Sequence, residues 1–294
     1  MIITRNSSTT PQALRDTMSS TQSMFRVAAI QMASGPHVAA NLQEAGRLIE
    51  LAAATGARIV GLPEYFAIMG MKDTDKVAAR ERDNDGPIQH FLAEQARRHK
   101  IWLVGGSVPL EASTPEKVRN ACVVYDQEGK RVARYDKIHL FGFEMGHEKY
   151  SEERTIEPGS RVVAVDSPYG RIGISVCYDL RFPELYRAMG DVDLIFVPSA
   201  FTETTGKAHW DTLIRARAIE NLAYVVAPAQ GGYHVNGRET HGHTMIVDPW
   251  GVVLDRLSRG SGVVVAGVNP TYQAKIRRSL PALTHKTVPV ATPG

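Results

Sequence analysis

The chain has 294 residues, of which 43% are hydrophobic and 22% charged, a composition typical of a globular protein that buries a large core. Its net charge of +3 is small for this length, and no run of lysine and arginine occurs, so the charge gives no support to nucleic-acid or membrane binding. No apolar run approaches the roughly 18 residues that a membrane-spanning helix needs. Two cysteines do not make a disulfide framework, so we expect a reducing compartment, the cytoplasm.

The first part of the chain has a different composition from the rest. Residues 1–24 are polar, rich in serine and threonine and aperiodic, which predicts a disordered extension without the apolar segment of a secretory signal. A transit peptide is the alternative, because Asp16 is the only acidic residue there, and Met24 could equally be the natural start. Residues 25–294 contain no linker or internal repeat, so we interpret them as one domain.

Predicted strands and helices alternate through that domain. Strands are predicted over residues 25–31, 57–62, 101–106, 193–198, 223–229 and 262–268, and helices over residues 41–54, 87–100 and 208–222. Turn sequences containing glycine predict hairpins that join residues 120–126 to 131–136, 161–166 to 171–176, and 244–248 to 252–256. Strands mixed with helices throughout predict an α/β protein with mixed sheets layered by helices.

One stretch, residues 171–189 (RIGISVCYDLRFPELYRAM), has the pattern of a strand followed by a turn and a helix. Alternating apolar residues lead to Cys177, and Pro183 suits the first turn of a helix. Such a turn exposes a nucleophile, and a nearby helix N-terminus favours the thiolate. A buried structural cysteine is the alternative, but the charged residues Asp179 and Arg181 so close by indicate a cleft.

A cysteine nucleophile needs a base or a positive neighbour, because at its ordinary pKa of about 8.5 little thiolate exists at neutral pH. Glu64 follows a predicted apolar strand in the phrase LPEYF, and Lys137 follows another strand in YDKIHLF. Strand ends are where the sites of α/β proteins assemble. Each residue alone has a plainer interpretation, Glu64 as a solvated carboxylate and Lys137 as a surface charge beside Asp136.

Together, LPEYF, YDKIHLF and CYDLRFPELYR resemble the three signature blocks of the nitrilase superfamily, the carbon–nitrogen hydrolases. The resemblance covers roughly residues 25–286 and places that family's Glu-Lys-Cys triad on Glu64, Lys137 and Cys177. The later phrases AQGGYH, MIVDPWG and LPALTHK resemble the Nit subgroup, with the amidases of deaminated glutathione nearest and ω-amidases next.

The resemblance implies a four-layer α-β-β-α sandwich whose protomers pair into an eight-layer dimer, with residues 208–222 as a candidate contact helix. It implies a thiol amidase that hydrolyses a linear non-peptide amide through a cysteine thioester and releases a carboxylate and ammonia. Glu64 would be the general base, with a pKa raised by a dry pocket, while Lys137 and the backbone N–H of Tyr178 would hold the oxyanion. A second family glutamate would fall on Glu152, with Glu153 one residue away as the alternative.

No metal or organic cofactor is implied, and the expected partner is a small amide substrate. For its carboxylate, Arg181 and Arg238 are candidates, although Arg181 could instead pair with Asp179 or Glu184. Phe201, after a predicted strand, either packs in the core or lines the pocket.

Several alternatives remain open from the sequence. His241 and His243 have a spacing that a metal could use, but without a third ligand in phase we interpret them as hydrogen-bonded structural histidines. The substrate could be α-ketoglutaramate, another aliphatic amide or a nitrile. A Nit-like binding or regulatory protein is the non-enzymatic alternative, which an intact triad disfavours. A thiol redox sensor would need Cys122 to resolve a sulfenate, and Cys122 lies in a core-like apolar run.

Overall fold

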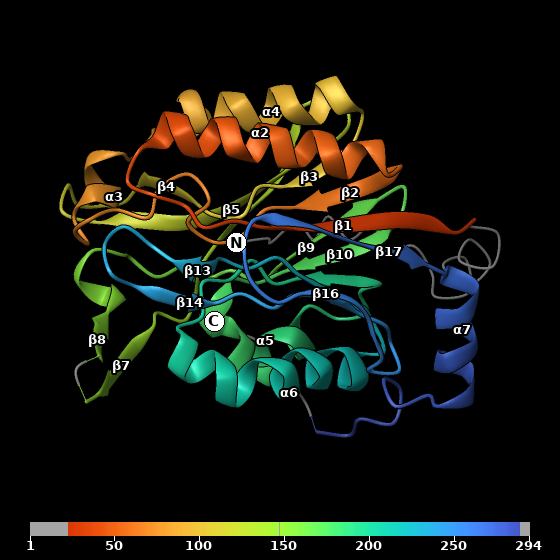
Figure 1. Ribbon diagram of the computed structural model, residues 1–294. Helices are drawn as coiled ribbons and strands as arrows, with labels where there is room; N and C mark the ends of the chain where they lie inside the picture. The colour runs from red at the N-terminus through yellow and green to blue at the C-terminus, as the bar shows by residue number, and fades with distance from the viewer. Residues whose placement is uncertain (1–22, 147, 289–294) are drawn as a thin grey trace, which may run out of the picture.

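The computed structural model describes residues 23–146 and 148–288, and these form two stacked β-sheets with helices on both outer faces. Figure 1 shows the layers in the order helix, sheet, sheet, helix, with α2 and α4 over one sheet and α5 and α6 over the other. The expected α/β class with mixed sheets is confirmed. Residues 1–22 lie outside the described residues, and the prediction of a disordered extension therefore remains a prediction.

The first sheet has the strand order β17-β1-β2-β3-β5-β4, with β6 paired to β5. Strands β1, β2 and β3 run parallel, whereas β17, β4, β5 and β6 join antiparallel. The bounds are β1 Phe25–Gln31, β2 Ala57–Gly61, β3 Trp102–Val104, β4 Val108–Glu111, β5 Val118–Tyr125, β6 Arg131–Asp136 and β17 Gly262–Val268.

The second sheet has the order β16-β15-β12-β11-β10-β9 and is parallel only across β10, β11 and β12. Its strands are β9 Val163–Ser167, β10 Gly170–Ile174, β11 Leu194–Phe196, β12 Tyr224–Ala227, β15 Thr244–Val247 and β16 Val253–Leu257. Two separate hairpins consist of β7 Gly142–Met145 with β8 Glu148–Ser151, and β13 Gly231–Tyr233 with β14 Glu239–His241.

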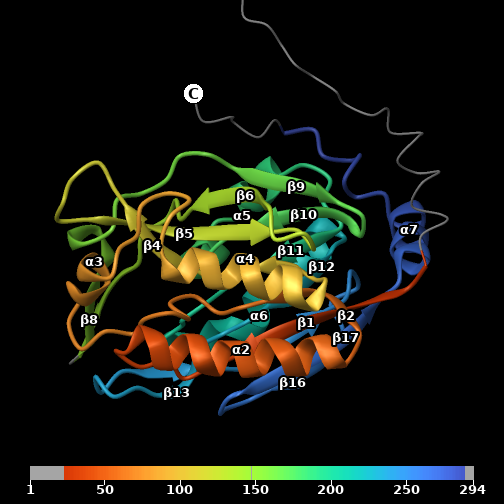
Figure 2. The same ribbon diagram turned by 90° about the horizontal axis from the view of Figure 1, so that it is seen from above.

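Helices α2, α4, α5 and α6 cover the outer faces of the two sheets, whereas α3 and α7 lie at the ends of the sandwich. Their bounds are α2 Val38–Ala54, α3 Asp75–Ala78, α4 Pro87–His99, α5 Pro183–Ala188, α6 Glu203–Asn221 and α7 Pro270–Ser279, with 3-10 turns η1 Glu152–Arg154 and η2 Cys177–Arg181. In α2 the buried residues recur every three or four positions, as Ala45, Leu48, Ile49 and Ala52, which turns one face towards the first sheet. Figure 2 shows α2 and α4 side by side over that sheet.

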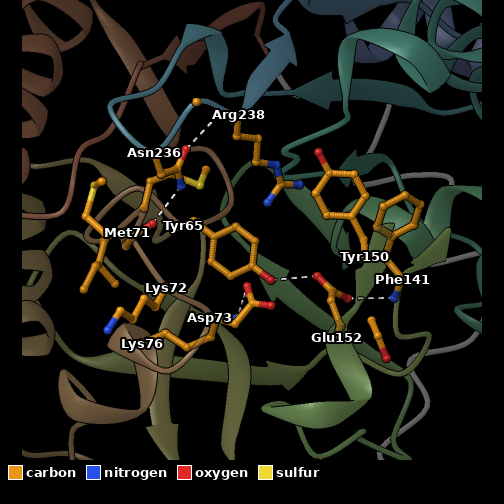
Figure 3. Close-up of a pocket in the computed structure, with 15 residues that line it drawn as sticks. Tyr65, Met71, Lys72, Asp73, Lys76, Phe141, Tyr150, Glu152, Asn236 and Arg238 are labelled. Atoms are coloured by element: carbon orange, nitrogen blue, oxygen red, sulfur yellow. Dashed lines mark hydrogen bonds and ion pairs between the residues drawn. The ribbon is translucent and has the colours of Figure 1, made fainter. Parts of the chain in front are cut away.

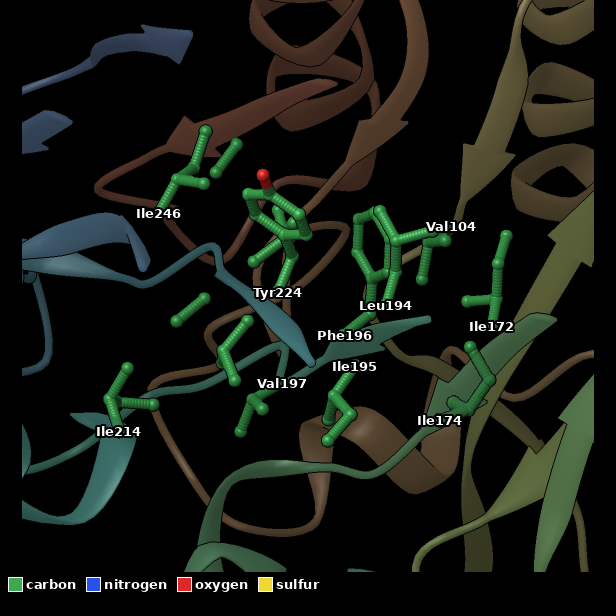
Figure 4. Packing of buried hydrophobic residues seen from close by; sticks show 14 of the residues in the cluster. Val104, Ile172, Ile174, Leu194, Ile195, Phe196, Val197, Ile214, Tyr224 and Ile246 are labelled. Carbon is green, nitrogen blue, oxygen red and sulfur yellow. The ribbon is translucent and has the colours of Figure 1, made fainter. Parts of the chain in front are cut away.

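The main core lies between the two sheets, where side chains from both interlock (Figure 4). Phe196 of β11 packs so closely on Gly61 of β2 that a Cβ atom at that glycine would lie 2.9 Å from the ring. This close approach places the end of β2 next to the second sheet. The residues that follow β2 can therefore meet those that follow β10.

The structure extends the sequence prediction in a few places. Helix α6 begins at Glu203 rather than 208, because the Thr202 side chain caps it by accepting the N–H of Thr205. The hairpins β7–β8 and β13–β14, the strand β4 and the helices α3 and α7 were not predicted, since they are short or carry few apolar residues. No helix in the described part of the chain is long and apolar enough to cross a membrane.

Candidate active site

Three strand ends from different parts of the chain meet at one site. Glu64 lies three residues after β2, Lys137 directly follows β6, and Cys177 opens the turn η2 three residues after β10. All three are buried, with relative exposures of 1%, 0% and 7%. Since β2 and β6 belong to one sheet and β10 to the other, stacking of the two sheets assembles the site.

Lys137 is the centre of the polar contacts. Its Nζ lies 2.9 Å from Glu64 Oε1 and 2.8 Å from Glu152 Oε2, so one ammonium serves two carboxylates. Glu64 Oε1 also accepts a hydrogen bond of 2.8 Å from Asn120 Nδ2, and the backbone carbonyl of Glu64 accepts one of 3.0 Å from Gln230 Nε2. These contacts leave the Glu64 carboxylate little freedom to rotate.

The structure distinguishes between the two adjacent glutamates. Glu152 accepts hydrogen bonds of 2.7 Å each from the Tyr65 hydroxyl and the backbone N–H of Phe141, in addition to its contact with Lys137. Glu153 is exposed. Of the two, Glu152 is therefore the residue with the contacts expected of the second glutamate.

Cys177 sits at a sharp elbow, as its strand-to-turn position predicts. Its φ of +51° is left-handed, a conformation that costs a non-glycine residue roughly 1–3 kcal/mol and clusters at functional sites. The Cys177 N–H donates to Pro198 O at 2.9 Å, and its Sγ accepts the N–H of Ala200 at 3.5 Å. The residues directly after it form a 3-10 turn, and α5 begins at Pro183, the position predicted for the start of the helix.

A buried aspartate two residues later joins the cysteine and lysine segments. Asp179 accepts hydrogen bonds from the Tyr135 hydroxyl at 2.7 Å and the Val176 N–H at 2.8 Å. It also accepts the His139 N–H at 3.1 Å, with His139 Nδ1 2.7 Å away. Tyr135 and His139 flank Lys137 at two residues on either side, and Val176 precedes Cys177. Asp179 thus fixes the ammonium-bearing segment against the elbow.

Burial shapes the protonation of the site. It raises the pKa of the Cys177 thiol well above its usual range, and the Glu64 carboxylate adds to this effect. The expected stabilisation of a thiolate does not prevail, and the resting sulfur is a thiol. Burial also raises the pKa of Glu64, although Lys137 opposes it, and this direction matches the expectation for a general base.

The other two charged groups keep their charges. Burial opposes the Lys137 ammonium, but Glu152 and Glu64 outweigh it and raise the Lys137 pKa. Burial opposes the Glu152 carboxylate as well, yet Lys137 lowers the Glu152 pKa below its usual value. At neutral pH the site therefore holds an ammonium, a carboxylate at Glu152 and a protonated thiol.

Two adjoining cavities give access to these groups. The inner one, here called the thiol pocket, has a volume of about 10 Å³, room for about one water, and is lined by residues that include Glu64, Cys177 and Tyr178. The outer one, here called the outer chamber, has a volume of about 290 Å³ and is shown in Figure 3. Phe141, Glu152 and Arg238 line both cavities and form the neck between them.

The three candidate substrate-binding residues all line the thiol pocket. The Arg181 guanidinium lies 5.6 Å from the Phe201 ring centre and 3.3 Å from His209 Nδ1. Asp179 is bonded elsewhere, so the alternative of an Arg181–Asp179 pair is wrong. Phe201 fulfils both expectations, because it also packs against Trp210 at 5.1 Å between ring centres.

His241 and His243 stack on each other with ring centres 4.2 Å apart, and His241 Nδ1 lies 3.0 Å from Glu203 Oε2. This hydrogen-bonded arrangement agrees with a structural role for His241. Cys122, in β5, is fully buried, as its apolar surroundings predict.

Sequence reasoning missed Asn120, Asp179 and Gln230 as residues of the site, and Tyr65 as the partner of Glu152. A signal existed for Asn120, an amide at the start of the apolar run ACVV, because a buried amide needs a hydrogen-bond partner. The sequence marks Asp179 only as a charge near the cysteine. Nothing in the local sequence connects Gln230 to Glu64, 166 residues earlier.

Comparisons with known proteins agree with this geometry. Residues 26–278 match the family model of the carbon-nitrogen hydrolases. Deaminated glutathione amidase from Synechocystis sp. is 41% identical over 268 residues, which are 89% of this chain and 98% of that protein. The crystal structure of the C. elegans NitFhit protein superposes with a TM-score of 0.80 at 36% identity, covering 90% of this chain and 65% of that one.

A mutant amidase from Nesterenkonia sp., whose structure shows the product of Michael addition of acrylamide at the active-site cysteine, has a TM-score of 0.73 and 26% identity. That match covers 87% of this chain and 98% of the other. A family match over most of the chain, with relatives similar over nearly their full length, shows that this protein belongs to the carbon–nitrogen hydrolases of the nitrilase superfamily.

Proposed function

We propose that the protein is a thiol amidase that cleaves a linear non-peptide amide through a thioester on Cys177. The observation that carries the proposal is the convergence of a thiol, a carboxylate of raised pKa and an ammonium in one buried pocket. A binding or regulatory protein would have no need of a buried ammonium held between two carboxylates, since such a cluster is costly to desolvate.

In the first half of the reaction, the Glu64 carboxylate takes the Sγ proton while the sulfur attacks the amide carbon. Cys177 and Glu64 both line the small thiol pocket, so the proton has a short path. The C–S bond forms as the carbonyl π bond breaks, and the oxygen becomes an oxyanion. Collapse of this intermediate expels the amine, which leaves with the proton from Glu64.

In the second half, Glu64 removes a proton from water, which attacks the thioester carbon. The C–S bond then breaks, the thiolate regains its proton from Glu64, and a carboxylic acid leaves. One carboxyl group can act twice only if it both accepts and donates protons near neutral pH. The raised pKa of Glu64 suits this double role.

Lys137 has a proton available for the oxyanion. An ammonium has three N–H donors. We propose that one N–H serves both oxygens of Glu152, which lie 3.0 Å and 2.8 Å from Nζ, and that a second serves Glu64 Oε1 at 2.9 Å. We propose that the third points to the substrate oxygen, together with the backbone N–H of Tyr178, which lines the thiol pocket. Glu152 would then act as the residue that orients Lys137.

For the substrate, we propose deaminated glutathione, the compound for which the 41% identical Synechocystis relative is named. This compound has no primary amide. Hydrolysis of its γ-amide therefore releases the dipeptide cysteinylglycine and not ammonia, the product expected from the sequence. Ammonia would be released from a primary amide such as α-ketoglutaramate. Deaminated glutathione carries a carboxylate at each end, and Arg181 and Arg238 at the thiol pocket are suited to bind one of them.

The test is a substrate panel with two assays. 2-Oxoglutarate and cysteinylglycine are quantified from deaminated glutathione, and ammonia is measured from α-ketoglutaramate, simple amides and nitriles. We expect the highest kcat/KM with deaminated glutathione, and faster turnover of α-ketoglutaramate would make ω-amidase the better assignment. Turnover of simple amides or nitriles alone would disprove the substrate proposal but leave the thiol mechanism in place.

We also propose a homodimer, located in the cytoplasm. The dimer follows from the family resemblance, and one exposed apolar surface supports it: Ile219 of α6, Trp250 and Val252 are 45%, 56% and 50% exposed. A Cβ at Gly251, between the last two, would touch Ile219, so the three are neighbours. The compartment follows from two free cysteines, neither of which forms a disulfide.

A further inference from the structure

The outer chamber is the space available for the part of a substrate that does not react. The thiol pocket, at about 10 Å³, is far smaller than the roughly 300–1,000 Å³ of ordinary ligand sites, whereas the outer chamber, at about 290 Å³, approaches that range. The chamber lies at the end of the sandwich where α3, β7–β8 and β13–β14 gather in Figure 1. A substrate whose amide reaches Cys177 must extend through the neck into it.

Cations dominate the lining of the outer chamber. Lys72, Lys76 and Arg238 line it, against the carboxylates of Asp73 and Glu152. Glu152 is already paired with Lys137. Asp73 is 76% exposed and lies 3.7 Å from Lys76 Nζ, a distance and exposure that give only a weak, solvent-screened interaction.

Lys76 is an unusual cation for its surroundings. Its side chain is only 14% exposed, its Nζ bonds to Thr155 Oγ1 at 3.1 Å, and it lies 5.8 Å from the ring centre of Tyr65. Burial lowers the Lys76 pKa. The carboxylates of Asp73 and Glu152 oppose this effect, and repulsion by the charges of Arg238 and Lys137 adds to it. An anion in the chamber would relieve this repulsion.

Arg238 points into the same chamber in Figure 3. Its Nη2 donates to Ala200 O at 3.1 Å, and its guanidinium lies 5.0 Å from the ring centre of Tyr150. Its Nε is buried and has no hydrogen-bond partner among the described residues. A buried donor without a partner costs free energy that an acceptor placed there would recover.

We propose that the outer chamber is a carboxylate subsite, in which Lys76 and Arg238 hold the substrate carboxylate that is remote from the scissile amide. The subsite deepens the proposed amidase function and rests on it for the identity of the ligand. Arg238, at the neck, would gain a partner for its orphan N–H, and Lys76 would gain a counterion in addition to the exposed carboxylate of Asp73. Lys76 and the chamber are additions to the candidate residues that the sequence indicated.

Binding of glutarate tests the subsite apart from catalysis, because this dicarboxylate has no amide to cleave. In calorimetric titrations, we expect Lys76→Met and Arg238→Met each to weaken glutarate binding by about 10–100-fold, the typical worth of a charge-assisted hydrogen bond. Lys76→Arg keeps the charge and should retain most of the affinity. Lys130→Met, an exposed lysine in the β5–β6 turn, is the matched control and should bind like the wild type.

A kinetic pair makes the same comparison during turnover. The two substrates are α-ketoglutaramate, which carries a carboxylate, and its neutral methyl ester. The wild type should have the higher kcat/KM with α-ketoglutaramate, and Lys76→Met should reduce this preference mainly through KM. Circular dichroism confirms that each variant is folded. Absence of glutarate binding by the wild type, or equal binding by the wild type and both methionine variants, overturns the subsite. If the wild type binds glutarate but hydrolyses no amide, the proposed amidase function is contradicted and the subsite is not.

Discussion

Replacing Lys137 with methionine is the most informative single change, because it removes the charge shared by two buried carboxylates while keeping much of the side-chain volume. The ammonium lies 2.9 Å from Glu64 Oε1 and 2.8 Å from Glu152 Oε2, with Lys137 fully buried. Breaking a buried ion pair by removing one partner typically costs about 3–5 kcal/mol, since the remaining charge is left without compensation. We therefore expect Lys137→Met to lower the free energy of unfolding by about this amount at neutral pH.

The cost should depend on pH in a defined direction. Lys137 opposes the rise in the pKa of Glu64, so its removal raises that pKa further. As the pH falls, Glu64 binds a proton in the folded variant and the uncompensated charge disappears. The destabilisation should thus be larger at about pH 8 than at about pH 5, because the folded variant binds protons more readily than the unfolded chain. Adding Glu64→Gln to Lys137→Met should recover part of the lost stability at the higher pH.

Urea unfolding at the two pH values measures the free energy of unfolding of Lys137→Met and the wild type. Hydrolysis of the preferred amide measures the loss of rate. Loss of one oxyanion donor typically costs about 10²–10³-fold in rate. Lys130→Met serves as the exposed control. A Lys137→Met protein within about 1 kcal/mol of the wild type at both pH values, or with turnover reduced less than about tenfold, would refute the role assigned to Lys137.

Four further outcomes are expected. Cys177→Ala should abolish hydrolysis in a folded protein, whereas Cys122→Ala, at a core position, should retain its turnover per folded molecule. An equal loss of turnover in both variants would contradict a thioester on Cys177. Asp179→Asn should lower kcat more than it raises KM, because it weakens the hydrogen bonds to Tyr135 and His139 that hold the Lys137 segment in place. An unchanged kcat would exclude a role of Asp179 in positioning Lys137. In the pH profile of kcat/KM, the pKa of the acidic limb should lie above the usual carboxyl range, because burial raises the Glu64 pKa. In Glu152→Gln this limb should move to lower pH, since the Glu152 charge raises the Glu64 pKa. A limb that stays in place would contradict Glu64 as the base. Light scattering of the wild type should give about twice the 32.2 kDa chain mass, and Trp250→Glu should reduce it to the mass of one chain. A monomeric wild type would disprove the dimer.

Much of the architecture follows from local patterns. The strands at residues 25–31, 131–136 and 262–268 have the predicted bounds, because a short apolar or alternating run is a local property that the stacked sheets preserve. The elbow at Cys177 also follows locally, from a strand that runs into a proline-started helix. The short elements β4, β7, β8, β13 and β14 could not be predicted, since each has only three or four residues and none lies within a longer apolar run. The equally short β3 and β11 lie within longer apolar runs and were predicted.

The sequence by itself predicted the candidate triad Glu64, Lys137 and Cys177, because each lies in a distinctive phrase at the end of a predicted strand. Only the tertiary structure decided between Glu152 and Glu153, since that choice depends on which carboxylate reaches Lys137. The thiol rests protonated for the same kind of reason: burial by residues distant in the chain outweighs the local effect of a following turn. The hydrogen bonds of Asp179 to Tyr135 and His139 likewise join segments some 40 residues apart, and only the stacking of the two sheets brings those segments together. The cations of the outer chamber also come from distant segments, around α3 and between β13 and β14.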